Sequence, residues 1–306
     1  MELTLVAFAS FYAAGRHTAR YADTLVQALG GQLVLLHVNH ASAYDPYAGV
    51  GESFRKAAQD RQVGTAAALE QQAHGLSSHP TVEVATDLLP AVAQDVAMRH
   101  HPALFVISQP APAHPAAAGL VAACAELLRA GNHPLLVVPI PTPAEQVPRR
   151  ILIAADRELF ALIPAAQPLH QLLALPGAAV FVAHVSEVED DEGCALALRA
   201  VQASGLTEGL PTPELRGYEA DDYAAGLLAA VQDTQAELVV VVARPRSYLS
   251  ELFHHSVTAR LLQRCPVPVL VLPTEPEAEG LPIESASLTT VGQWTNAVLS
   301  GLSPAS

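Results

Sequence analysis

The chain alternates short apolar runs with longer segments whose apolar positions recur every three or four residues. The short runs are typical of strands and the longer segments of amphipathic helices. The strands expected in the first half are residues 3–9, 32–38, 81–86, 103–108 and 134–139. The helices expected there are residues 15–29, 53–74, 89–100 and 120–129.

The second half repeats this order of elements. Its expected strands are residues 150–155, 179–185, 214–218, 236–243 and 267–272. Its expected helices are residues 162–173, 194–205, 223–234 and 255–263. Strands separated by single helices predict right-handed crossovers, and therefore a parallel sheet with helices on both faces.

Short stretches of sequence occur once in each half. QLVLLHV, ending at Val38, matches AVFVAHV, ending at Val185, and aligns His37 with His184. HPLLVVP, ending at Pro139, matches VPVLVLP near the end of the second half. The two copies of each stretch lie much farther apart along the chain than the repeats of a solenoid, so they indicate two duplicated domains.

We therefore expect an α/β protein with two tandem doubly wound domains, each with a five-stranded parallel sheet. The first domain is expected at residues 1–140 and the second at 149–273, with a linker between them. The Pro-, Glu- and Ser-rich residues 274–306 are expected to form a loosely held C-terminal tail.

Composition excludes several classes of protein. The net charge is −14, from 16 basic and 30 acidic residues, so nucleic acid is not an expected partner. No apolar run reaches the roughly 20 residues that span a bilayer, so we expect no membrane segment. The three cysteines lie in dissimilar settings and indicate neither a disulfide framework nor a zinc site. We expect a protein of the reducing cytoplasm.

Three features carry a resemblance to a known family. They are ILIAAD at 151–156, the second strands of the two halves with LLHV and FVAHV, and above all VVVVARPRSYLSELFHHSVTARLLQRCPVPVLVLP at 239–273. With these segments the chain resembles the universal stress protein family, over residues 1–140 and 149–273. The resemblance implies a five-stranded parallel sheet and pairing through the last strand. We therefore expect residues 134–139 and 267–272 to meet within the chain, and a homodimer is left open.

The resemblance also implies where a nucleotide would bind. Nucleotide-binding members have a G-x-x-G, nine residues, then G-S/T loop after the fourth strand, where glycines let the backbone approach phosphates. The three glycine positions in the second copy hold Val242, Pro245 and His255, followed by Ser256. Pro245 also lacks an N–H group to donate. The matching positions in the first copy are Ser108, Ala111, Val121 and Ala122.

The family places an aspartate at the end of the first strand, near the adenosine. Asp156 fills that position in the second copy, whereas the first copy has Ser10. An aspartate there has a second interpretation, since its side chain can simply cap the following turn.

Polar residues of the second copy's loop offer another means of holding an anion. Arg244 and Arg246 flank a proline, and Ser247 and Ser256 accompany them. A guanidinium pair with hydroxyls can hold a phosphate or carboxylate without a glycine loop. The alternative is a surface loop whose arginines pair with the chain's own carboxylates. The candidate ligand-binding residues are Asp156, Arg244, Arg246, Ser247 and Ser256, and two guanidiniums against one carboxylate predict an anionic ligand.

Patterns that indicate catalysis or metal binding are missing from the sequence. It contains no G-x-S-x-G elbow, no P-loop and no G-x-G-x-x-G fingerprint. The histidine pairs 100–101 and 254–255 are adjacent, so their side chains diverge on a helix and cannot easily share a metal. We expect no catalytic residue and no metal site, and expect His37 and His184 to be hydrogen-bonded structural residues.

Two functional hypotheses follow. The first is a non-enzymatic tandem universal stress protein, without a cofactor, that acts in a stress response through protein contacts or an unidentified small ligand. The alternative is an adenine-nucleotide-binding stress protein that holds ATP or AMP in its second domain only, with slow ATPase activity.

Overall fold

The computed structural model describes residues 2–9, 13–38, 64–110, 117–245 and 256–275, and residues 1–276 belong to one compact unit. The first half contains β1 (Thr4–Phe8), α1 (Ala13–Leu29), β2 (Gln32–Val38), a helix at 64–74, β3 (Thr81–Ala85), α3 (Leu89–Arg99), β4 (Ala103–Gln109), α4 (Ala117–Gly131) and β5 (Leu135–Pro139). The second contains β6 (Arg150–Ala154), the 3₁₀ helix η2 (Gln167–Leu169), α5 (His170–Leu173), β7 (Ala179–Ser186), α6 (Asp191–Ala203), β8 (Glu214–Glu219), α7 (Tyr223–Asp233), β9 (Leu238–Ala243), α9 (Val257–Arg264) and β10 (Val269–Pro273).

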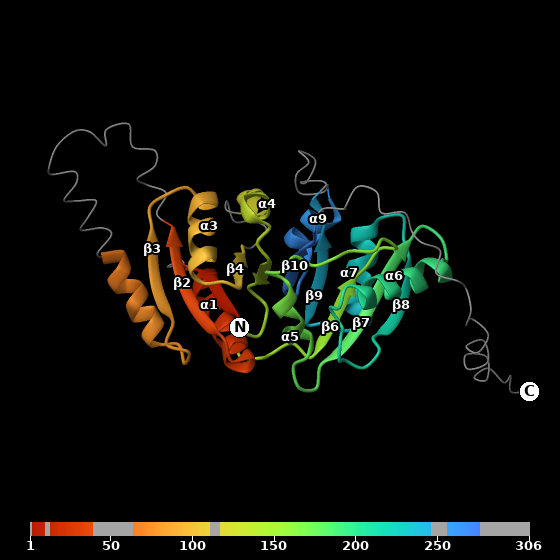
Figure 1. Ribbon diagram of the computed structural model, residues 1–306, viewed down its shortest axis with the longest axis horizontal. Coiled ribbons are helices and arrows are strands. Elements are labelled where there is room, and N and C mark those ends of the chain that lie inside the picture. The colour runs from red at the N-terminus through yellow and green to blue at the C-terminus, as the bar shows by residue number, and fades with distance from the viewer. Residues whose placement is uncertain (1, 10–12, 39–63, 111–116, 246–255, 276–306) are drawn as a thin grey trace, which may run out of the picture. The chain divides into compact units, whose positions relative to one another are not determined.

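All ten strands lie in one sheet, in the order β3-β2-β1-β4-β5-β10-β9-β6-β7-β8 (Figure 1). Each half has the same internal order, and its neighbouring strands are parallel. The prediction of two doubly wound five-stranded units is therefore confirmed. The halves join where β5 and β10 pair antiparallel, with Leu136 opposite Leu270. Gln109, at the end of β4, reinforces this junction by donating from Nε2 to the Leu262 carbonyl of α9 (2.9 Å).

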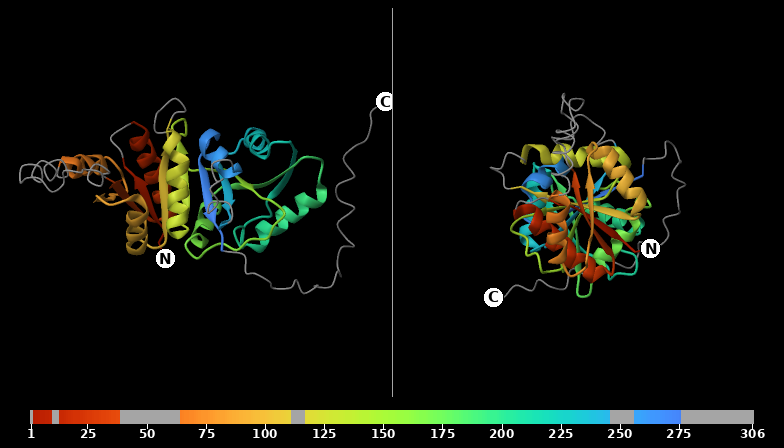
Figure 2. Two further views of the ribbon diagram at one scale, coloured as in Figure 1. Left: turned by 90° about the horizontal axis from the view of Figure 1, so that it is seen from above. Right: turned by 90° about the vertical axis from the view of Figure 1, so that its left-hand side faces the viewer.

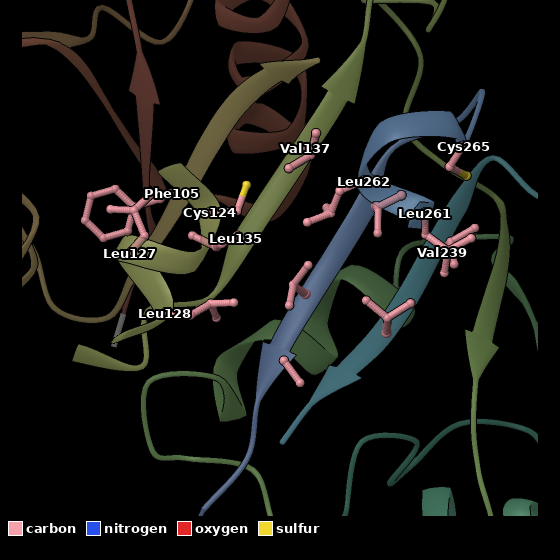
Figure 3. Packing of buried hydrophobic residues seen from close by; sticks show 14 of the residues in the cluster. Phe105, Cys124, Leu127, Leu128, Leu135, Val137, Val239, Leu261, Leu262 and Cys265 are labelled. Atoms are coloured by element: carbon pink, nitrogen blue, oxygen red, sulfur yellow. The ribbon is translucent and has the colours of Figure 1, made fainter. Parts of the chain in front are cut away.

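Alternate side chains of the strands enter two hydrophobic cores, one on each face of the sheet. Val6 belongs to the core under α3, α4, α7 and α9, whereas Leu5 belongs to the core under α1, the 64–74 helix, α5 and α6. Helices on both faces are visible in Figure 2. The first core crosses the junction, where α4 and α9 bring Leu127 and Leu261 into the same cluster (Figure 3). Strands buried on both faces explain the continuous apolar runs of the sequence.

The predicted helix at 162–173 is wrong in its first half. Leu162 instead forms an isolated antiparallel bridge with Thr274, and only η2 and the short α5 are helical. Pro164 and Pro168 explain the difference, because proline has no N–H group and obstructs the preceding turn of a helix. The predicted helix at 53–74 is observed over 64–74, and its residues 53–63 lie outside the described part of the chain.

Across the described ranges, none of the helices combines the length and apolar character needed to cross a membrane.

Candidate functional site

A cavity of about 420 Å³ opens at the carboxyl ends of β6, β7 and β9, within the second half. Ligand-binding crevices of open α/β sheets occur at this position. Its lining consists of residues that follow these strands and residues that begin α7 and α9. They are Ala154, Ala155, Asp156, Arg157, Glu158, Ala183, His184, Val185, Ser186, Tyr223, Leu227, Val241, Val242, Val257 and Thr258.

Asp156 and Arg244 meet at the edge of this cavity. Asp156 follows β6 and accepts a hydrogen bond at Oδ1 from the Glu158 backbone N–H (3.0 Å), which is the turn cap that its sequence position allows. Arg244 follows β9, is only 8% exposed, and donates from Nη2 to the same Oδ1 (2.6 Å). It also donates to the carbonyls of Glu158 (2.9 Å) and Leu159 (3.1 Å), and its Nε lies 3.3 Å from Glu158 Oε2. Arg244 therefore holds the loop after β6 in place.

The other candidate residues have different positions. Ser256 caps α9, where its Oγ accepts a hydrogen bond from the Ala259 backbone N–H (3.1 Å). Arg246 and Ser247 lie outside the described residues, as do two phosphate-loop positions, Ala111 and His255, and Ser10, the first copy's counterpart of Asp156. Val121 of the first copy is buried in the core beside α4.

His184 lines the cavity from the end of β7. Its Nδ1–H donates to the Ala155 carbonyl (3.2 Å), and His37 donates in the same way to the Ala9 carbonyl (3.1 Å). The prediction that both are hydrogen-bonded is confirmed. Both make the same contact because they occupy matching positions in the two halves. The Nε2 atom of His184 is buried without a hydrogen-bond partner and lies 3.6 Å from Asp190 Oδ2.

Asp190 lies next to His184, immediately before α6. It caps α6 by accepting a hydrogen bond from the Gly193 backbone N–H (2.7 Å), and this bond is the main reason why the pKa of the Asp190 carboxyl is lowered. Arg157 Nη1, which lies 3.6 Å from Asp190 Oδ2, lowers this pKa further. A Cβ atom on Gly193 would come within 2.7 Å of His184 Nε2 and closer still to Asp190 Oδ2, so only glycine fits here.

Asp222 caps α7, one of the two helices whose first residues line the cavity. Its Oδ1 accepts hydrogen bonds from the backbone N–H groups of Ala224 (3.0 Å) and Ala225 (3.3 Å). Arg260 of α9 adds a bidentate ion pair, which is the largest cause of the lowered pKa of Asp222. An Asp or Ser immediately before a helix is the usual sequence signal of such a cap, and it precedes α6, α7 and α9. The phosphate-loop pattern does not include this signal.

The remaining wall is mostly apolar. This wall includes Leu227, Val241 and Val257, together with Tyr223, a residue that is 46% exposed. The hydroxyl of Ser186 donates to the Val188 carbonyl (2.7 Å), so it makes no nucleophile–base pair with the neighbouring imidazole. In the described part of the chain, no group of three His, Cys, Asp or Glu residues is arranged to hold a metal ion.

The fold is that of solved universal stress proteins. A universal stress protein from Archaeoglobus fulgidus DSM 4304 is similar to this chain with a TM-score of 0.61 and 14% identity, covering 89% of this chain and 96% of that one. A putative universal stress protein from Pseudomonas aeruginosa UCBPP-PA14 has a TM-score of 0.51 and 15% identity, covering 89% and 93%. No curated protein matches the chain significantly.

The doubly wound halves define a Rossmann-like α/β protein, with a cavity at the carboxyl ends of the strands of its second half. Residues 148–273 match the model of the universal stress protein family. This part of the chain therefore belongs to the universal stress protein family, as the segments ILIAAD and VVVVARPRS…VPVLVLP predicted.

Proposed function

We propose that this protein is a non-enzymatic stress-response protein of the cytoplasm that holds a small ligand in the cavity of its second half. The observation that carries the proposal is the cavity of about 420 Å³, a volume within the usual range for small-molecule sites. Its position at the carboxyl ends of the strands, where open α/β sheets bind ligands, supports a binding site rather than an incidental hollow. Action through protein contacts is the other form of this proposal.

The side chains around the cavity support binding rather than catalysis. His184 donates to a backbone carbonyl through Nδ1, and Ser186 to another through its hydroxyl, so neither side chain activates the other. The described cysteines, Cys124, Cys194 and Cys265, are all free thiols, which suits a reducing compartment.

The test is to purify the full chain from cells, denature it, and analyse the released small molecules by mass spectrometry. Val242→Phe fills the cavity, whereas Val188→Phe adds the same ring at a side chain that is 65% exposed and outside the cavity. We expect a compound that accompanies the wild type and Val188→Phe but not Val242→Phe. If all three proteins release the same compounds, and metabolite mixtures raise their Tm equally, the cavity is not a ligand site.

A second candidate function is adenine-nucleotide binding by the second half, with ATP or AMP as ligand and slow ATPase activity. Asp156 favours it, because this carboxylate lines the cavity at the end of β6, where the family resemblance places an adenosine contact. Against it stand Val242 and Pro245, which replace two glycines of the phosphate loop.

Absorbance at 260 nm distinguishes the two functions. Nucleotide released from the wild type, together with phosphate release from ATP above that of Val242→Phe, supports the second function. A titration of ATP, AMP and phosphate into the wild type and into an Arg244→Ala/Arg246→Ala double variant checks the guanidinium pair. Equal binding by both proteins would remove that pair from the site.

A further inference from the structure

We infer that the cavity of the second half takes an uncharged or cationic ring-bearing ligand with a hydrogen-bond donor, rather than a phosphate or carboxylate. The inference rests on the proposed function and specifies the chemical class of its ligand. It follows from how the helix N-termini, guanidiniums and carboxylates around the cavity are already used.

In each helix that begins near the cavity, one or two of the first N–H groups already have a side-chain acceptor. A phosphate binds such a terminus because the first N–H groups have no partner within the helix. Here Asp190, Asp222 and Ser256 supply oxygen acceptors to the first turns of α6, α7 and α9. Two of these caps are carboxylates, which also place a negative charge where an anion would otherwise lie.

The guanidiniums that the structure describes near the cavity are occupied as well. Arg244 makes three hydrogen bonds to the loop after β6, one of them to Asp156, so an anion would have to replace a short ion pair. Arg260 is bound to both carboxylate oxygens of Asp222. Arg157 is 62% exposed and lies beside Asp190, in a position where solvent screens its charge.

The charge balance therefore opposes an anion. The sequence alone sets Arg244 and Arg246 against Asp156, and Arg246 lies outside the described residues. Among the described residues, folding adds Glu158 and Asp190, so the three carboxylates of Asp156, Glu158 and Asp190 face the two guanidiniums of Arg157 and Arg244. The chain as a whole, with a net charge of −14, repels anions further.

The free polar group and the apolar wall indicate what fits instead. Oδ2 of Asp156 makes no hydrogen bond with any described residue, and the Asp156 side chain is 57% exposed at the cavity wall. It can accept a hydrogen bond from an N–H or O–H group of a ligand. Leu227 and Val257 offer an apolar surface to a ring, and Tyr223, which lines the cavity and is 46% exposed, supplies an aromatic side chain of the kind that attracts a cation.

Three indole compounds that share a ring and differ in charge test this inference. They are tryptamine, which is cationic, tryptophol, which is uncharged, and indole-3-acetate, which is anionic. Ligand-observed NMR of the full chain measures each dissociation constant, and binding that Val242→Phe abolishes but Val188→Phe preserves is assigned to the cavity. We expect tryptamine and tryptophol to bind there on the order of fivefold or more tightly than indole-3-acetate.

Variants that remove one charge then show which residue produces the preference for the cationic ligand. Asp156→Asn should reduce the advantage of tryptamine over tryptophol, whereas Glu187→Gln, an exposed position outside the cavity, should preserve it. Indole-3-acetate binding as tightly as tryptamine in the wild type overturns this inference and leaves the small-ligand function standing. If no indole compound binds the wild type better than Val242→Phe, the inference is overturned, whereas the small-ligand function is decided separately by the compounds released from the denatured wild type and Val242→Phe.

Discussion

Arg244 and Asp156 form an ion pair, 2.6 Å from Nη2 to Oδ1, that joins the ends of β9 and β6. The two residues are separated by most of the second half in sequence. Their contact closes the loop after β6 and decides which charges remain available at the cavity.

This pair should contribute measurably to stability. We expect Arg244→Ala to lower the free energy of unfolding by about 2 kcal/mol and Asp156→Ala by about 1 kcal/mol, because Arg244 is buried and Asp156 is half exposed. Urea unfolding of both single variants and the double variant gives the coupling energy. Effects that simply add would show that the two side chains act independently in solution.

Gly193 and Gly119 should respond in opposite ways to alanine. Both lie in helices, where alanine is favoured over glycine by up to about 1 kcal/mol. A Cβ atom at Gly119 meets no atom within 4 Å, so Gly119→Ala should stabilise the protein. Gly193→Ala should destabilise it, since the new methyl group displaces Asp190 from its cap on α6 and crowds His184. Thermal unfolding measures both, and a stabilising Gly193→Ala would contradict the described packing.

His133 should make stability depend on pH. Burial lowers its pKa to about 4 from the ordinary 6.5, and its Nε2 has no hydrogen-bond partner. Between these values the unfolded chain binds a proton that the native protein does not, so the stability contribution is complete above pH 6.5 and is lost progressively as the pH falls towards 4. The loss should reach up to about 3 kcal/mol.

Urea unfolding at several pH values, compared with His133→Leu, checks this prediction. The variant should lose less stability between pH 6.5 and 4, and His17, whose pKa burial also lowers, should supply part of the slope that remains. His74→Gln, at an exposed position, controls for the loss of one histidine. Parallel pH profiles for the wild type and His133→Leu would show that His133 is accessible to protons in the native state.

The junction strand should make an isolated second half self-associate. Residues 149–276 expressed alone leave β10 without β5, and an unpaired apolar edge is a template for another strand. We expect a concentration-dependent dimer in analytical ultracentrifugation. Residues 1–276 are the control, because β5 covers that edge; an isolated half that stays monomeric at high concentration would show that its edge is protected in another way.

Much of the fold could be predicted because parallel strands that are buried on both faces appear in the sequence as continuous apolar runs. The strand expected at residues 32–38 has those bounds in the structure, and that at 179–185 ends one residue later. The helix expected at 162–173 failed where prolines interrupt an apolar stretch that otherwise has helical spacing. Its apolar residues are buried, but in turns and a bridge rather than in a helix.

The sequence by itself determined the duplicated α/β order, the position of Asp156 at the end of a strand, and the loss of the phosphate-loop glycines, since each depends on neighbours along the chain. Only the tertiary structure decided the partner of Arg244 among 30 acidic residues, because that choice depends on which loops converge. The same convergence placed Glu158 in the cavity wall and Asp190 beside His184, so that among the described residues the carboxylates there outnumber the guanidiniums. Electrostatic interactions depend on distance in space, which residue spacing along the chain does not supply.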